Sequence, residues 1–311
     1  MKTQHPSHTH DYIWIADAIN CSLAHTERDQ NPVFGIPSGF PSLDRLTKGW
    51  GEGDLVVIGG RPCSGNTALA LSMARNAAVD FCVPTAYFSF GTPFLDLSDR
   101  LIVSESGIPM QKLHGASKME KEEWQRLESS LKKLSRSPLY LDCTPAGIQG
   151  ECLLSEFKSK ADRLAGETGV KLFFVDGFQA TIPDWVQWEP DSLAHYSRKS
   201  LRLLKDFARF YGAAIVVLTN IGRPKGTRYP GPFLKDLDDY CPHAEDYADK
   251  IILLHRPALH GLVPDEERDT LELRLVQNRN GRTGTAELLF DSERIRVVEP
   301  VDKGNVRYDS L

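Results

Sequence analysis

Long apolar runs are missing from this 311-residue sequence. No stretch approaches the roughly 18 consecutive apolar residues that a membrane-spanning helix needs, so we expect no segment to cross a membrane. The first ten residues are polar and rich in histidine, and they lack the apolar region of a secretory signal peptide. These absences predict a cytoplasmic protein.

Cysteines are few and are poorly arranged for disulfides or zinc. They form no C-x-x-C pair, and none lies at zinc-ligand spacing from a histidine. The six are Cys21, Cys63, Cys82, Cys143, Cys152 and Cys241. We interpret them as reduced thiols. A chain of this length buries enough apolar surface to fold without cross-links or a structural metal.

A basic excess is also missing, because the formal net charge is −5. Dedicated nucleic-acid-binding domains usually carry clustered positive charge. The negative balance argues against a general nucleic-acid binder, although it allows a basic channel on one face. Hydrophobic residues make up 41% of the chain and charged residues 25%, which predicts a folded globular protein rather than a disordered one.

The first 32 residues differ from the rest of the chain. We expect residues 1–10 to be a disordered tail with solvated histidines. Residues 11–26 carry apolar side chains at helical spacing, namely Ile13, Ile15, Ala16, Ile19 and Leu23. This helix either packs on its own domain or docks on a neighbouring subunit. We therefore place a domain boundary at residue 33, so that residues 33–311 form the main domain.

Strands and helices alternate from residue 33 onward. Strands are predicted at residues 55–59, 85–90, 138–142, 171–176, 213–219 and 250–255. Helices are predicted at residues 68–79, 94–106, 117–135, 148–166 and 191–211. This alternation predicts an α/β fold with a mostly parallel twisted sheet, helices on both faces and ligands at the carboxyl ends of the strands.

Two local signals refine these boundaries. Ser117 and Glu120 have the spacing of a capping box, so we expect the helix at residues 117–135 to begin there. Residues 271–277 and 285–290 flank a glycine-bearing turn, which predicts a carboxyl-terminal β-hairpin.

A glycine-rich stretch follows the strand at residues 55–59. Its residues are Gly60, Arg61, Pro62, Cys63, Ser64, Gly65, Asn66 and Thr67. They match the phosphate-loop pattern G-x-x-x-x-G-K-[ST], except that Asn66 replaces the lysine. Glycines let the backbone wrap a phosphate, and the following helix offers free N–H groups. The alternative is a strand–helix turn that binds nothing.

The missing lysine bears on chemistry more than on folding. Lysine would add a full positive charge at the β- and γ-phosphates, whereas the Asn66 amide only donates hydrogen bonds. A charge-assisted hydrogen bond contributes about 1.5–3 kcal/mol. We therefore expect weak binding of ATP or ADP, and weaker stabilisation still of the transition state for hydrolysis. Lys48 lies too far back to be an evident substitute, and the sequence does not give the direction of Arg61.

Asp176 ends the apolar strand at residues 171–176. An aspartate in this position suits Mg²⁺ binding through water, with the Thr67 hydroxyl as the other metal ligand. This second feature argues against a turn that binds nothing.

The motifs occur in the order found in one family. Residues 35–44, residues 53–55 and the Arg61-Pro62 pair resemble the entry to the motor domain of DnaB-type replicative helicases, which is a RecA-like P-loop NTPase. Later motifs of that family resemble residues 88–90, 138–142, 175–179, 236–237, 245–249 and 277–285. The resemblance implies ATP, Mg²⁺, single-stranded DNA and a hexameric ring.

The same resemblance bears on the amino terminus. Residues 11–26 resemble the linker helix that docks on the next subunit of the DnaB ring. Because only about 30 residues precede the motor domain, we expect the family's separate primase-interaction domain to be absent.

The departures from the family fall on functional positions. Asn66 stands at the phosphate-loop lysine, Gly91 at the catalytic glutamate and Asn220 at the sensor glutamine. General-base catalysis is typically worth about 10²–10⁴-fold, which Gly91 cannot supply. Asp96 and Asp99 follow Gly91 by one to two helical turns.

Two further segments differ. The resemblance places the family's hairpin lysine at Gln277 and keeps its arginine finger, which acts on a neighbour's site in trans, as Arg279. The DNA-contact loop reads Asp238-Asp239-Tyr240, where the family carries an arginine after Asp-Leu. Negative charge at this loop opposes the binding of DNA phosphates.

Three functions remain open. The chain is an active ATP-dependent 5′-to-3′ DNA helicase, a non-hydrolysing DnaB-like binding or regulatory subunit, or a RecA-like domain reused as a regulator. The second function, a pseudo-ATPase, includes a ring of identical chains or a mixed ring with an active helicase. Five substitutions at functional positions on an intact scaffold favour it.

Overall fold

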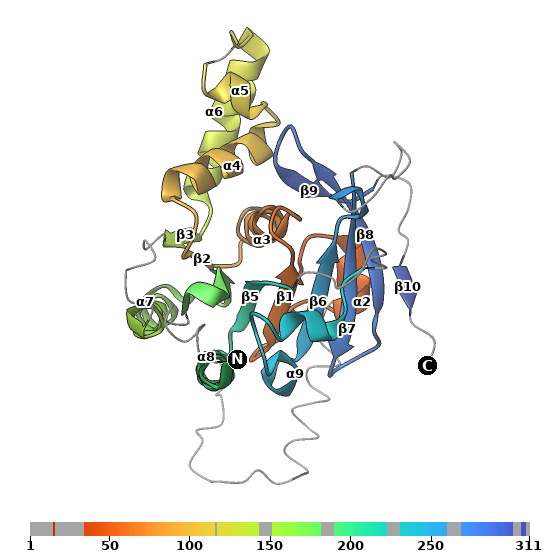
Figure 1. Ribbon diagram of the computed structural model, residues 1–311. Coiled ribbons are helices and arrows are strands. Elements are labelled where there is room, and N and C mark those ends of the chain that lie inside the picture. The colour runs from red at the N-terminus through yellow and green to blue at the C-terminus, as the bar shows by residue number, and fades with distance from the viewer. Residues whose placement is uncertain are drawn as a thin grey trace.

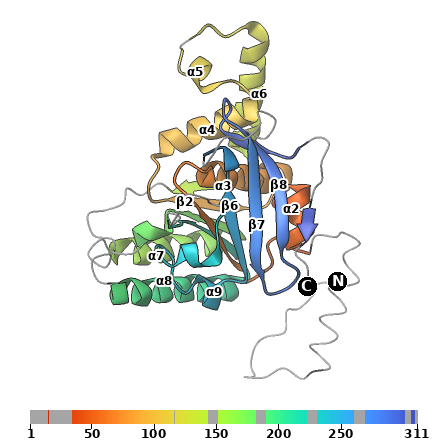
Figure 2. The same ribbon diagram turned by 45° about the vertical axis from the view of Figure 1, so that its right-hand side comes forward.

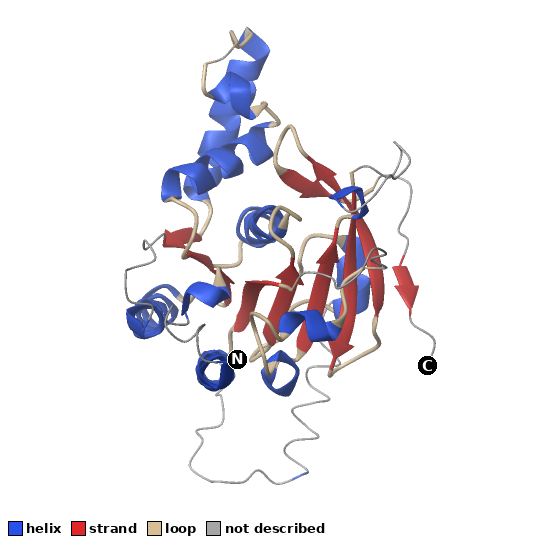
Figure 3. Cartoon of the chain, viewed as in Figure 1, coloured by secondary structure: helices blue, strands red, loops and turns tan. Residues whose placement is uncertain are grey.

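Six parallel strands form the centre of the sheet. A computed structural model of the chain describes residue 15 and residues 34–115, 117–142, 151–181, 190–222, 231–259, 269–300 and 306–308. The parallel strands run in the order β3-β2-β4-β5-β1-β6. They are β1 (Leu55–Gly60), β2 (Thr85–Ser89), β3 (Leu139–Asp142), β4 (Leu172–Asp176), β5 (Ala214–Asn220) and β6 (Lys250–His255). The predicted α/β fold is confirmed (Figure 3).

An antiparallel extension continues the sheet beyond β6. The predicted hairpin is present as β7 (Thr270–Asn278) and β8 (Gly284–Asp291), with β7 antiparallel to β6. Two short strands, β9 (Arg296–Val298) and β10 (Val306–Tyr308), pair with β8 and were not predicted. Three residues are too few to show a two-residue period, so no pattern in the sequence indicates them.

The longer helices largely follow the predicted ranges. They are α3 (Asn66–Arg75), α4 (Phe94–Ser106), α6 (Lys121–Arg136), α7 (Glu151–Thr168) and α8 (Pro190–Tyr211). One π-helical turn, η1 (Asn76–Asp80), extends α3. Short helical segments are α2 (Pro41–Thr47), α5 (Met110–Leu113), η2 (Phe178–Thr181), η4 (Leu234–Leu237), α9 (Ala244–Tyr247) and η5 (Pro257–Leu259). Among the described residues, every helix is too short or too polar to span a lipid bilayer.

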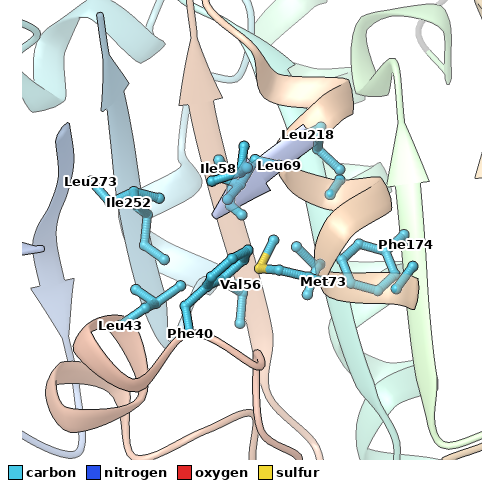
Figure 4. Close-up of a cluster of buried hydrophobic side chains, with 14 of the residues drawn as sticks. Phe40, Leu43, Val56, Ile58, Leu69, Met73, Phe174, Leu218, Ile252 and Leu273 are labelled. Carbon is cyan, nitrogen blue, oxygen red and sulfur yellow. The ribbon is translucent and has the colours of Figure 1, made fainter. Parts of the chain in front are cut away.

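Apolar side chains cover both faces of the sheet. Along β1, Val56 and Ile58 pack into a cluster with α2 and α3, and Figure 4 shows them beside Leu69 and Met73. The alternate β1 residues belong to a second cluster with α7, α8 and α9. Burial on both faces explains why the parallel strands are almost continuously apolar.

The start of α6 differs from the prediction. Glu120, rather than Ser117, precedes the first helical residue, and its N–H donates to Glu123 Oε2 at 2.9 Å. Glu123 lies three residues into the helix and supplies the reciprocal half of a capping box, so the helix begins three residues later than the Ser117 pattern indicated. Helices α4, α5 and α6 project from the body of the molecule (Figures 1 and 2).

The amino-terminal predictions lie outside the described residues. Of residues 1–33, only Ile15 is described. The helix at residues 11–26, its two docking alternatives and the boundary at residue 33 therefore stay predictions. The start of the predicted helix at residues 148–166 is likewise outside the described part.

Two buried ion pairs lie at the amino-terminal ends of β1 and β6. Asp249 Oδ2 accepts hydrogen bonds from Lys205 Nζ at 2.5 Å and from Leu55 N at 2.7 Å. Lys250 pairs with Asp54 beside it. All four side chains are almost excluded from solvent, so each charge depends on its partner for stabilisation.

We expect Asp249→Ala to destabilise the fold strongly. The substitution leaves the Lys205 ammonium and the Leu55 N–H buried without this acceptor, which costs about 3–5 kcal/mol. Urea denaturation followed by circular dichroism measures the change. A double variant, Lys205→Met with Asp249→Leu, removes both charges and should lose less stability. An equal or larger loss in the double variant would contradict the buried-charge explanation.

Candidate nucleotide site

A cavity of about 470 Å³ lies at the carboxyl ends of β1, β4 and β5. This is the edge at which the sequence predicted ligand binding. Seven of the eight predicted phosphate-loop residues have positions around it: six line it, and Gly60 ends β1 directly before the loop. The cavity is also lined by Gly91, Asp176 and Asn220. The fold therefore brings together residues that lie far apart in the sequence.

The loop between β1 and α3 is held by its own hydrogen bonds. Ser64 donates to the Arg61 carbonyl through its N–H at 3.0 Å and through its hydroxyl at 2.6 Å. Gly65 has a φ of 107°, a left-handed conformation that favours glycine. The helix then begins at Asn66, so the unbonded N–H groups of its first turn lie at the loop.

The Asn66 amide bonds to main-chain carbonyls of the strands. Its Nδ2 donates to Gly60 O at 3.1 Å and to Thr219 O at 3.4 Å. Gly60 and Thr219 lie at the ends of the neighbouring strands β1 and β5. The hydrogen-bonding groups of Asn66 are thus used in joining the loop to the sheet, and the side chain brings no charge to the cavity.

Thr67 and Asp176 are in direct contact. The Thr67 hydroxyl donates to Asp176 Oδ2 at 2.9 Å, and the Tyr87 hydroxyl donates to the same oxygen at 2.8 Å. Burial raises the pKa of the Asp176 carboxyl, and the two hydroxyl hydrogen bonds oppose that rise in part. The sequence indicated Thr67 and Asp176 as a pair but gave no signal for Tyr87.

The position of Gly91 offers free space. A Cβ atom added there would meet nothing within 4 Å, although the residue lines the cavity. Asp96 and Asp99 do not line the cavity, and Asp99 instead pairs with His114 Nε2 at 2.8 Å. Neither aspartate therefore replaces a carboxylate at Gly91.

Two arginines line the cavity, and sequence reasoning missed one of them. Arg61 comes from the phosphate loop, and Arg100 comes from α4, which follows Gly91 in the chain. The positive charge of Arg100 acts on Asp176 and favours its ionised form. A single arginine on an amphipathic helix carries no distinctive pattern, so only the folded structure identifies Arg100 as a cavity residue.

The hairpin residues Gln277 and Arg279 lie at the opposite end of the sheet. Asn278 pairs with Lys250, the first residue of β6, whereas the phosphate loop follows the last residue of β1. Arg279 donates to the carbonyls of Glu245 and Asp246. The sequence assigned Arg279 and the phosphate loop to one function, but the fold separates them within one chain.

The loop that follows η4 is acidic and exposed. Asp238, Asp239 and Tyr240 all have exposed side chains. Asp236 in η4 is half-buried instead, and its carboxylate accepts a hydrogen bond from Phe233 N at 3.0 Å. The negative charge predicted at this loop is therefore available to solvent.

A phosphate loop between β1 and α3, with an aspartate at the end of β4 two strands away, defines a RecA-like P-loop fold. Comparison with known proteins names the family. The sequence model of the DnaB-like helicase C-terminal domain matches residues 35–299. The chain belongs to this family.

Curated relatives and solved structures agree with that assignment. The replicative DNA helicase DnaB of Treponema pallidum is 31% identical over 285 residues, which cover 91% of this chain and 60% of the relative. The replicative DNA helicase DnaC of Bacillus subtilis is 30% identical over 262 residues, covering 84% and 56%. The chain thus spans about three fifths of the length of these relatives.

Two solved structures resemble the fold closely. One is an isolated ATPase domain, which superposes with a TM-score of 0.79 at 26% identity and covers 93% of this chain and 100% of that one. The other is a DnaB-like replicative helicase, studied for its interactions with primase, which gives a TM-score of 0.75 at 25% identity and covers 93% and 68%.

We expect Gly60→Ala and Gly91→Ala to have opposite outcomes. A Cβ at Gly60 would lie 1.9 Å from Asn66 Oδ1, so Asn66 must move and give up its hydrogen bonds. Such overpacking costs about 1–3 kcal/mol. A Cβ at Gly91 meets open space, and a change within about 0.5 kcal/mol is expected. Thermal unfolding of both variants measures the difference, and equal losses would contradict the described loop.

We expect Asp176→Asn to stabilise the chain at pH 7 in the absence of metal and nucleotide. Burial raises the pKa of Asp176 in the folded state, so ionisation costs stability as the pH rises from the unfolded-state pKa of about 3.9 through the folded-state value. Asparagine avoids that cost. The melting temperature should rise by a few degrees, at roughly 2–4 °C per kcal/mol.

The pH dependence provides the control for this prediction. Below about pH 4 the carboxyl is protonated in both the folded and the unfolded state, and the advantage of Asp176→Asn should shrink. A variant that is equally stabilised in acid and at neutral pH would show that charge is not the cause.

Proposed function

We propose that this chain is a DnaB-like motor domain that binds nucleotide weakly and hydrolyses it poorly or not at all. It acts as a binding or regulatory subunit, either in a ring of identical chains or in a mixed ring with an active DnaB-type helicase. The arm at residues 11–26 and the main domain at residues 33–311 are part of this proposal.

One observation carries the proposal. Among the described residues that line the nucleotide cavity, Asp176 is the only carboxylate. It already accepts hydrogen bonds from Thr67 and Tyr87. A general base must reach the attacking water by a hydrogen bond, and Gly91 supplies no group for that contact. The cavity therefore keeps groups for binding and lacks the group for activating water.

The residues present fit a nucleotide. A volume of about 470 Å³ lies within the range of roughly 300–1,000 Å³ that is usual for small-molecule sites. The loop N–H groups, together with the guanidinium groups of Arg61 and Arg100, favour phosphate. These two arginines offset part of the charge that Asn66 does not provide.

The same residues fit Mg²⁺. The Thr67 hydroxyl and the Asp176 carboxylate are hard oxygen ligands, and they already lie within hydrogen-bond distance of each other. The described residues contain no cluster of three or more histidine, cysteine or acidic side chains suited to a metal, so phosphate and water would complete the coordination. Bound Mg²⁺ would neutralise phosphate charge.

Arg279 supports an action in trans. Because it lies at the opposite end of the sheet from its own phosphate loop, it serves only a site on another chain. Donating an arginine finger needs no chemistry in the donor's own cavity. An inactive chain can therefore still contribute to the site of a neighbour in a ring.

Charge disfavours DNA binding at the loop after η4. Asp238 and Asp239 are exposed, and proteins bind DNA phosphates by neutralising them with lysine and arginine. We propose that single-stranded DNA, if bound at all, is held by other parts of a ring.

An active helicase is the second candidate, and Arg100 is the observation in its favour. A guanidinium beside Asp176 places positive charge in the cavity independently of Asn66. DNA-stimulated ATP turnover by the homogeneous wild-type chain would establish this candidate and reject the first.

We expect the purified chain to bind ATP with Mg²⁺ but to release no phosphate above background, with or without single-stranded DNA. Asn66→Lys should tighten binding by about 10–100-fold, because a charge-assisted hydrogen bond is worth roughly 1.5–3 kcal/mol. Asn66→Lys with Gly91→Glu should restore measurable turnover. Fluorescent-nucleotide titration and a phosphate-release assay measure the two properties. Gly91→Gln, which adds similar volume without a carboxylate, is the matched control for Gly91→Glu.

The cysteine of the phosphate loop offers an independent measure of binding. Cys63 is exposed and lines the cavity, whereas Cys82 is exposed elsewhere. Mg²⁺ and ATP should slow alkylation of Cys63 and leave that of Cys82 unchanged, as read by peptide mass spectrometry. Equal rates at Cys63 with and without nucleotide would contradict binding at the loop.

Mixing chains tests the role of Arg279. In the Asn66→Lys, Gly91→Glu background, Arg279→Ala should abolish turnover, since an arginine finger contributes about 10³–10⁵-fold. Adding the wild-type chain, which keeps Arg279 but lacks the chemistry, should recover part of the activity. Arg282→Ala on the same hairpin is the control. Absence of recovery on mixing would contradict action in trans.

A further inference from the structure

A second cavity lies on the face of the sheet covered by α7, α8 and α9. Its volume is about 870 Å³, and it shares no lining residue with the nucleotide cavity. Its apolar part consists of Leu203, Phe207, Phe210, Tyr211 and Tyr247. We name it the α8 groove, and Figure 1 shows α8 beside α7 and α9 at one edge of the molecule.

Phe210 is the unusual residue of the groove. Its side chain is 80% exposed, although the neighbouring Phe207 is buried at 4%. The Phe210 ring meets Tyr211 edge-on with the centroids 4.8 Å apart. A large aromatic ring held in solvent inside an apolar hollow with a polar rim is the usual signature of a protein-binding site.

The charges of the rim favour an acidic partner. Of its four cations, Lys158 pairs with Asp162 at 2.6 Å and Arg202 pairs with Asp206 at 3.8 Å. Arg198 donates to His243 Nε2 at 3.1 Å, and no described carboxylate pairs with it or with Lys199. The rim is therefore locally positive on a chain whose net charge is −5.

We propose that the α8 groove binds an amphipathic helix of a partner protein, with apolar side chains on one face and glutamate or aspartate at its edges. The apolar floor takes the apolar face, and Arg198 and Lys199 take the carboxylates. Nucleic acid fits less well, because its evenly spaced phosphates would approach the carboxylates of Asp162 and Asp206 as well as the cations.

Two designed peptides test the proposal. One is an amphipathic helix with leucine and phenylalanine on one face and glutamate at both edges, and the other has lysine in place of each glutamate. Fluorescence anisotropy with the full chain should show that the acidic peptide binds at least about tenfold more tightly than the basic one. Phe210→Ala and Lys199→Glu should each weaken the acidic peptide by about tenfold.

A matched charge reversal controls for the general effect of charge. Lys132→Glu lies on the exposed face of α6, away from the groove, and should leave binding unchanged, while all variants keep the melting temperature of the wild type. Failure of the acidic peptide to bind, or equal binding by the groove variants, overturns the proposal. So does loss of binding to an oligothymidine, or a change of oligomeric state, in those variants, because the groove would then serve DNA or a second copy of the chain.

Discussion

Parallel pairing of β1 between β5 and β6 is the constraint on which the candidate site depends. The pairing aligns Gly60 with Asn220 on one side, and β4 follows beyond β5. Every group of the nucleotide cavity that comes from a strand end owes its position to this register. The buried ion pairs of Asp249 and Asp54 hold the other end of β1, so the strand is fixed at both ends.

Much of this arrangement could be predicted because strand ends carry strong local signals. Apolar runs marked the six parallel strands, and their carboxyl ends must meet at one edge. The contact between Thr67 and Asp176 follows from that rule, although 109 positions separate the two residues. Family motifs, which are spread along the chain, agreed with the same edge and with the domain that the family comparison identifies.

What the sequence did not reveal depends on the direction of individual side chains. Asn66 is visible as a substitution, but its hydrogen bonds to Gly60 and Thr219 depend on the packing of β1 against β5. Arg100 reaches the cavity from a helix whose face toward the site has no motif. The true cap of α6 was missed because Ser117 and Glu123 both belong to reasonable capping patterns, and only the path of the chain selects one.

The separation of Arg279 from the phosphate loop has a consequence for counting. In a closed ring of such chains, each member faces two sites: it owns one cavity and lends an arginine to the next. A member whose own cavity is inert but whose arginine is intact silences one site and leaves its neighbour's complete. Ring activity would then fall in graded steps, in proportion to the number of such members, rather than all at once.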